Sequence, residues 1–271
     1  MSEPGSPVCA PDWLALREPA DAAARATELA TAAAAGLGRG PVTVRDLGCG
    51  TGSMLRWLAP HLPADQRWYL HDRDPELLAV AAARAGSVPV ETVLGDLTGL
   101  GAADLAGTSL VTCSALLDLL TAEEVAGVAA ACVEAGCLAL FTLSVAGRVV
   151  FDPADELDAV FAAAFDAHQR RPVDGRRLTG PDAGAAVAAA FAELGATVEQ
   201  RSSPWRLGPA DAALVEEWLR GWIGAACAQV PELRISAGGY LGRRLDELAA
   251  GRLHVLVDHL DVLATPGRPP C

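Results

Sequence analysis

The stretch "RDLGCGTGSMLRWL" (residues 45–58) decides the fold. It ends an apolar run, "VTVRDL" (42–47), and then places Gly48, Gly50 and Gly52 within five residues. The apolar run predicts a buried strand, and the residues after the glycines predict a helix. A strand, a glycine-rich turn and a helix bring the backbone close to a ligand at the carboxyl edge of a sheet. The stretch therefore predicts a small-ligand site in an α/β fold.

Short apolar runs alternate with helical segments along the chain, which is the pattern of βαβ units and a parallel sheet. The predicted strands are 42–47, 67–72, 89–94, 109–114, 137–145, 196–202 and 253–264. The predicted helices are 19–35, 53–62, 75–85, 122–135, 153–170, 181–194, 210–229 and 237–250. Asp74 and the Thr121/Glu124 pair are predicted to cap two of them. We expect an α/β fold with a seven-stranded sheet.

Composition excludes several classes of function. All 21 basic residues are arginine, which excludes Schiff-base chemistry and a lysine-containing phosphate loop. The net charge of −13 argues against a nucleic-acid partner. The chain shows no long uncharged apolar stretch and no signal-like start, so we expect a cytoplasmic protein without membrane contact. Seven cysteines without a CxxC pair predict neither a disulfide framework nor a bound metal.

Acidic residues end three successive predicted strands. Asp46 precedes the glycine turn, Asp72 ends the second strand and Asp96 follows the third. A carboxylate in the place of Asp72 can accept bonds from both ribose hydroxyls, and one in the place of Asp96 can accept from an adenine amine. Ser53 stands where a dinucleotide turn needs a third small glycine or alanine. Each acid alone also suits a solvated strand end, but together with the glycines they favour a nucleoside site.

These motifs resemble the class I S-adenosylmethionine-dependent methyltransferases. The resemblance rests on "VTVRDLGCGTG", "WYLHDRDPELL", "VLGDL" and "VTCSALLDLL", and it covers residues 40–145. It implies S-adenosylmethionine as cofactor and a Rossmann-like, mostly parallel sheet with helices on both faces and an antiparallel last strand. The implied cofactor-binding residues are Arg17, Asp46, Gly48, Gly50, Gly52, Asp72, Arg73, Asp96, Leu97 and Ser114.

The resemblance also divides the chain. Residues 1–40 are expected to form a tail and a helix that cover the cofactor, and 41–271 the methyltransferase domain. Helical insertions at about 146–180 and 207–250 are expected to cap the acceptor site. Either Arg17 or Arg25 is suited to bind the methionine carboxylate, unless both belong to a solvated helix with local ion pairs.

Motifs that the sequence lacks narrow the range of expected methyl acceptors. The segment "CSALLD" (113–118) is neither the [DNS]PP[YF] pattern of amide and adenine-amine methylators nor a Pro-Cys nucleophile. We therefore expect methyl transfer to an oxygen or nitrogen of a small molecule, with an anionic metabolite as one candidate. The candidate substrate-binding residues are Arg170, Arg171, Trp205, Arg206, Trp222 and Tyr240. His168 and Asp118 are the candidate catalytic residues, although a packed histidine and a solvated or capping acid are the alternatives.

Several alternatives stay open at this point. The four arginines in "RRPVDGRR" (170–177) form either a solvated loop paired with nearby acids or a clamp for an anionic acceptor. The same cofactor also serves methylation at carbon and cyclisation. A catalytically silent subunit that binds the cofactor for a partner enzyme is a third possibility, and an oligomer is compatible with the sequence.

Overall fold

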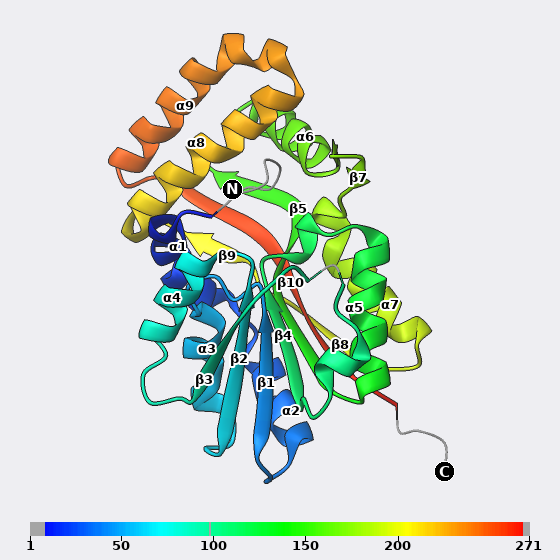
Figure 1. Ribbon diagram of the computed structural model, residues 1–271. Helices are drawn as coiled ribbons and strands as arrows, with labels where there is room; N and C mark the ends of the chain where they lie inside the picture. Colours follow the sequence, from blue (N-terminus) through cyan, green and yellow to red (C-terminus); the bar gives the residue numbers. More distant parts are fainter. Residues whose placement is uncertain (1–8, 98, 268–271) are drawn as a thin grey trace.

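A computed structural model describes residues 9–97 and 99–267. The predicted amino-terminal tail falls mostly outside the described residues, as do the last four residues with Cys271. Figure 1 shows a central sheet with helices on both faces and a group of three helices, α6, α8 and α9, beyond one end of the sheet.

The centre of the molecule is an eight-stranded sheet in the order β3-β2-β1-β4-β5-β10-β8, with β9 paired to β10. The strands are β1 (Val42–Leu47), β2 (Gln66–Asp72), β3 (Val90–Leu94), β4 (Leu110–Ser114), β5 (Leu138–Asp152), β8 (Thr197–Ser202), β9 (Trp205–Leu207) and β10 (His254–Thr265). Strands β1 to β5 pair in parallel, and β10 is antiparallel to β5, β8 and β9. The α/β class and the antiparallel last strand are confirmed.

The predicted number of strands was too low. The short strand β9 continues the edge after β8, and β6 (Pro172–Val173) pairs with β7 (Arg176–Arg177) in a separate hairpin. Such short strands show no periodicity of their own, because they are defined by the strand they pair with.

Helices cover both faces of the sheet. They are α1 (Pro11–Ala24), α2 (Thr27–Leu37), α3 (Ser53–Leu58), α4 (Pro75–Ala83), α5 (Ala122–Ala135), α6 (Asp158–Gln169), α7 (Ala183–Glu193), α8 (Ala212–Gln229) and α9 (Arg234–Ala249). Apolar side chains of α2, α3 and α4 pack on one face, and those of α5 and α7 pack on the other. Strand β4 is buried on both faces, as expected for the centre of a parallel sheet.

One predicted helix is divided in two. The prediction of a helix over 19–35 was wrong, because the chain leaves the helical conformation at Arg25 and begins α2 two residues later. The buried carboxylate of Asp261 accepts the backbone N–H of Ala26 at 2.8 Å, so this donor does not continue α1. The contact joins residues 235 positions apart, which no local pattern reveals.

Strand β5 is longer than the predicted 137–145. Its second half pairs with β10 as far as Asp152 opposite His254, and this extended ribbon leads into the helices α6, α8 and α9. Those three helices share an apolar core with β9 and the start of β10, which includes Phe161, Trp222 and Tyr240. We call this unit the cap.

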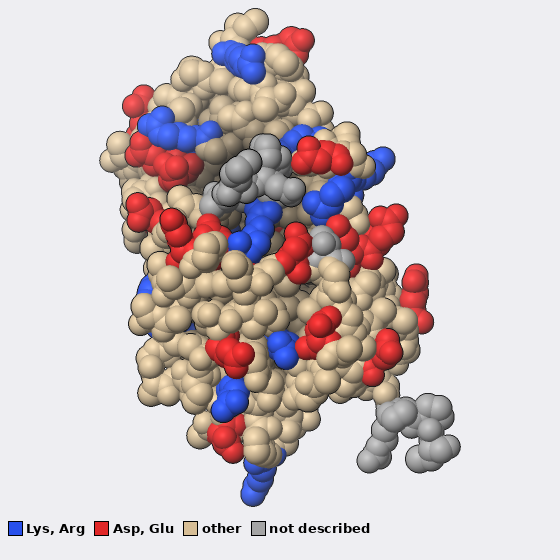
Figure 2. All heavy atoms as spheres, viewed as in Figure 1, with Lys and Arg blue, Asp and Glu red and all other residues tan. Residues whose placement is uncertain are grey.

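None of the helices in the described parts of the chain is long and apolar enough to cross a membrane. On the face shown in Figure 2, acidic and basic side chains are interspersed.

Candidate functional site

The glycine turn between β1 and α3 has a backbone that side chains rarely allow. Gly48, Gly50 and Gly52 have φ angles of +65°, +54° and +82°. A Cβ atom on Gly48 would lie 2.5 Å from Cδ2 of Leu116, which follows β4. Glycine at these positions thus permits both the left-handed backbone and the close approach of neighbouring groups.

Asp72 ties the turn to the end of β2. Its Oδ2 accepts the backbone N–H of Gly50 at 2.9 Å, and its Oδ1 accepts that of Asp74 at 3.0 Å. A carboxylate has about four lone-pair sites, so each oxygen of Asp72 keeps capacity for a further donor. Asp74 caps α4 as predicted, by accepting the N–H of Glu76.

Asp46 lies beneath the turn and is only 1% exposed. Its Oδ1 accepts the Thr112 hydroxyl at 2.7 Å, whereas its Oδ2 has no hydrogen-bond partner among the described residues. Burial raises the pKa of Asp46 to about 7, although the Thr112 hydrogen bond and the charge of Arg25 favour the ionised form.

Arg25 is the buried cation of this site, with 3% exposure. Its Nη2 donates to the hydroxyls of Ser114 at 2.9 Å and Ser53 at 3.2 Å, and its Nε donates to Thr142 at 3.4 Å. Its Nη1 is buried without a partner in the described chain. The guanidinium therefore lies beside the first residue of α3 with one donor group unused.

Helix α1 lies over the glycine turn. Leu14 Cδ1 is 3.1 Å from where a Cβ of Gly50 would be. Glu18 of α1 accepts two hydrogen bonds from Arg56 of α3, at 2.6 and 2.8 Å, and pairs with Arg84 at the end of α4. These contacts fasten α1 across the helices that follow β1 and β2.

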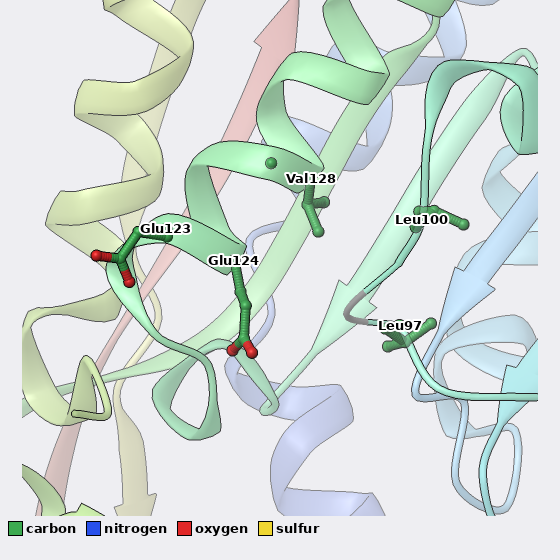
Figure 3. A pocket seen from close by; sticks show the side chains of 6 residues that line it. Leu97, Leu100, Glu123, Glu124 and Val128 are labelled. Atoms are coloured by element: carbon green, nitrogen blue, oxygen red, sulfur yellow. The ribbon is translucent and has the colours of Figure 1, made fainter. Parts of the chain in front are cut away.

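A cavity of about 220 Å³ lies beside the segment after β3. Figure 3 shows Leu97 and Leu100 on one side of it and Val128 of α5 on the other, with Glu124 at the start of that helix. Asp96 and Arg73 are exposed near the same sheet edge. The cavity offers apolar walls next to the third strand-end acid.

A second cavity, of about 170 Å³, lies where the sheet edge, α1 and the cap meet. We call it the acceptor cavity. Its lining residues are Trp13, Arg17, Ala115, Asp118, Leu143, Val145, Gly147, Arg148, Val149, Phe165, Asp166, Gln169, Trp205, Trp218, Val257, Asp258 and His259. Asp118 lies in the short turn after β4, and burial raises its pKa to about 6.

Residues 44–135 match the model of a protein family described as "Methyltransferase domain". The matched segment runs from β1 through α5 and contains the glycine turn, Asp72 and Asp96. Within this segment the chain carries a methyltransferase domain. S-adenosylmethionine is the methyl donor that the sequence motifs imply for this domain. No curated protein sequence matches the chain significantly.

Solved structures share the fold of this methyltransferase domain. The YcgJ protein from Bacillus subtilis is 15% identical at a TM-score of 0.51, and the match covers 89% of this chain and 99% of that one. The apo form of the mycolic acid cyclopropane synthase CmaA1 is 14% identical at a TM-score of 0.50, with 95% and 100% covered. At such low identity the likeness concerns the fold alone.

The residues around the turn fit the cofactor of the methyltransferase. Three buried polar atoms there have no partner within the described chain, namely Arg25 Nη1, Asp46 Oδ2 and Thr51 Oγ1. Buried polar groups are nearly always paired, so unpaired ones next to a glycine turn indicate a ligand that supplies the partners. A carboxylate and an ammonium, the two ends of a methionine tail, match the free arginine and aspartate atoms.

The two arginines that were candidates for binding the methionine carboxylate lie in different places. Arg25 contacts Ser53 and Ser114 at the glycine turn, whereas Arg17 pairs with Asp21 and lines the acceptor cavity. The guanidinium of Arg17 lies 4.9 Å from the ring centre of Trp205. The structure thus brings the predicted residues Trp205 and Asp118 into one cavity with Arg17.

Other predicted substrate and catalytic residues lie outside that lining. His168 is separated from it because Phe165, Asp166 and Gln169 share one face of α6, and His168 lies to the other side of Phe165. Trp222 and Tyr240 are buried in the core of the cap, where Tyr240 donates to Asp158 at 2.6 Å.

Three of the four arginines in the predicted clamp are already engaged elsewhere. Arg170 forms two hydrogen bonds with Asp182, Arg171 donates to the carbonyl of His168, and Arg176 pairs with Glu124. Arg206 is exposed on β9. None of these arginines lines the acceptor cavity.

Sequence reasoning missed Trp13, Asp166, Trp218 and His259, which line the cavity from α1, α6, α8 and β10. Trp218 carried a weak signal as the partner of Trp222 one helical turn away. The others stand in ordinary amphipathic segments, and only the packing of four distant elements brings them together.

Proposed function

We propose that the methyltransferase moves the methyl group of S-adenosylmethionine to an oxygen or nitrogen of a small molecule in the acceptor cavity. One observation carries this proposal: buried polar atoms without a partner among the described residues surround a glycine turn that Asp72 holds in place. The acceptor cavity lies at the same sheet edge, because Asp118 follows β4 just as the turn follows β1.

The cofactor would be held by residues of four segments. Asp72 would accept from the ribose hydroxyls with its remaining lone pairs. Arg25 would bind the methionine carboxylate, and Asp46 Oδ2 would accept from the methionine ammonium. Leu97 would place the adenine against the walls of the 220 Å³ cavity, with Asp96 beside it.

The outer segments of the chain would enclose both ligands. Residues 1–40 are proposed to cover the cofactor, which the position of Leu14 over Gly50 supports. The insertions at about 146–180 and 207–250 are proposed to close the acceptor cavity, to which they contribute Phe165 and Trp218.

When bound, S-adenosylmethionine supplies a methyl group that its sulfonium already activates. The chain therefore has to align the acceptor and exclude water, which apolar walls such as Trp13 and Trp205 do. Asp118 is suited to accept the acceptor's proton, because it lines the cavity and its pKa of about 6 lies near neutrality. The cytoplasmic location, the lack of a nucleic-acid partner and the lack of a metal stay predictions from the sequence.

Calorimetry with S-adenosylhomocysteine tests the cofactor site. Asp72→Ala should weaken binding at least tenfold, because both ribose acceptors and the anchor of Gly50 are lost. Asp74→Ala is the matched control, since Asp74 caps α4 and should affect stability alone. Unchanged affinity of Asp72→Ala would contradict the ribose assignment.

A methyl-labelled donor tests the reaction itself. Incubation with small alcohols and amines should place the label in a product whose new bond is O–CH₃ or N–CH₃. Label on carbon, or no transfer at all with a cofactor that binds, would count against the proposed reaction.

A further inference from the structure

The acceptor cavity contains an excess of unpaired negative charge. Its charged lining residues are Arg17, Asp118, Arg148, Asp166 and Asp258. Arg17 forms two hydrogen bonds with Asp21, and Arg148 pairs with Asp258 at 3.3 Å. Within the described chain, no other residue donates a hydrogen bond or ion pair to the side chain of Asp118 or Asp166. Both basic groups are thus paired with other carboxylates. Asp118 and Asp166 are left without a hydrogen-bonded basic partner among the described residues, although the charge of Arg17 acts on Asp118 and that of Arg170 on Asp166.

A buried histidine adds an unpaired polar atom to the same lining. His259 is 4% exposed, and its Nδ1 has no hydrogen-bond partner in the described residues. Burial and the nearby charge of Arg17 lower the pKa of His259 to about 3, so the ring stays neutral. A neutral imidazole can accept a hydrogen bond from an N–H group of a ligand.

The aromatic walls also favour a cation. The guanidinium of Arg17 lies 4.9 Å from the ring centre of Trp205 and 6.0 Å from that of Trp13. The rings of Phe165 and Trp218 line the cavity as well. Aromatic faces attract positive charge, and the rings also supply apolar contact area.

We propose that the methyl acceptor is a small primary or secondary amine, which binds as an ammonium to Asp118 and Asp166 and lays its apolar body against Trp218 and Phe165. The inference rests on the proposed function and names the substrate class of that site. The volume of about 170 Å³ limits the body to roughly one six-membered ring, since a cavity of about 150 Å³ holds benzene. Arg170 and Arg176 are bound by Asp182 and Glu124, and none of the arginines at 170–177 lines the cavity.

The proposed methyl transfer balances in atoms and charge. The ammonium gives one proton to Asp118, and the free nitrogen lone pair forms the new N–C bond. The C–S bond of the donor breaks, its electron pair stays on sulfur, and the positive charge passes from sulfur to the methylated nitrogen. Asp118 then releases its proton to water.

Calorimetry on the complex with S-adenosylhomocysteine tests the charge preference. The probes are benzylamine and cyclohexylamine, with benzyl alcohol and benzoate as ligands of similar size and different charge. We expect both amines to bind at least tenfold more tightly than the alcohol and the carboxylate. Benzoate that binds as tightly as the amines, or failure of both amines to bind, overturns the inference.

Asp166→Asn tests the residue assignment. It should weaken benzylamine binding about ten- to a hundredfold, because a charged hydrogen bond is lost, and leave the affinity for S-adenosylhomocysteine unchanged. Glu216→Gln is the control, since it removes the same charge from an exposed pair with Arg220 on α8. Unchanged benzylamine affinity in Asp166→Asn contradicts the assignment.

Binding and transfer measurements distinguish a failure of the proposed function from a failure of the amine inference. If S-adenosylhomocysteine does not bind the wild-type chain, the proposed function fails and the amine site fails with it. If S-adenosylhomocysteine binds and the labelled methyl group passes to benzyl alcohol in preference to benzylamine, the amine inference alone is overturned.

Discussion

Asp46 makes the stability of the cofactor-free protein depend on pH. Its carboxyl group is 1% exposed and receives one hydrogen bond, from Thr112, and burial raises its pKa from 3.8 to about 7. The unfolded chain loses this proton above about pH 4, whereas the folded chain keeps it up to about pH 7. The contribution of Asp46 to stability is therefore greatest below pH 4 and is lost as the pH rises through 7.

The size of the effect follows from the shift. About three pKa units at about 1.36 kcal/mol each amount to about 4 kcal/mol, of which about 3 kcal/mol develops between pH 5 and pH 8. Asp46→Asn removes the titration but keeps the shape of the side chain. Urea unfolding without cofactor should therefore show the variant gaining about 3 kcal/mol relative to wild type between those pH values.

Two controls make the test specific. Asp65→Asn, on an exposed loop, should leave the pH dependence of wild type unchanged. S-adenosylhomocysteine should flatten the wild-type curve, because its ammonium beside Oδ2 favours the ionised carboxylate. Parallel stability curves for wild type and Asp46→Asn would refute the reasoning and indicate that Arg25 offsets the burial of an ionised Asp46.

Three further predictions concern the same sheet edge. Gly48→Ala should lower the free energy of unfolding in urea by about 1–2 kcal/mol, because its φ is positive. The new methyl group would also meet Leu116 and should abolish S-adenosylhomocysteine binding; normal affinity would contradict this. Arg25→Gln should weaken S-adenosylhomocysteine about ten- to a hundredfold in calorimetry but leave methylthioadenosine, which lacks the carboxylate, unaffected; equal losses would exclude a carboxylate contact. The methylation rate should fall below about pH 6 as Asp118, faced by Arg17, becomes protonated. Asp118→Asn should lower kcat by roughly 10²–10⁴-fold and remove this fall in rate at low pH. A fall that persists in the variant would exclude Asp118 as the base.

Local patterns predicted the cofactor half of the molecule well. The limits of β1 at 42–47, the cap by Asp74 and the capping box of Thr121 and Glu124 are all confirmed. These features depend on residues a few positions apart, so periodicity and capping chemistry reveal them. The parallel strands then bring Asp46 and Asp72 to one edge, as the strand order requires.

Features that depend on distant partners could not be predicted in this way. Asp261 ends α1 through Ala26, and β10 extends β5 beyond its local apolar pattern. The arginines at 170–177 looked available in the sequence, but Asp182 and Glu124 bind two of them in the folded chain. In each case the deciding contact joins separate elements of the fold.

The sequence by itself determined the glycine turn, its acids and the sheet that presents them, because backbone conformation and strand ends follow from neighbouring residues. Only the tertiary structure decided that Arg25 contacts the turn, whereas Arg17 pairs with Asp21 and lines the acceptor cavity together with Trp205. The charge of that cavity is set by which acids find a basic partner, and this depends on how α1, α6 and β10 pack around it.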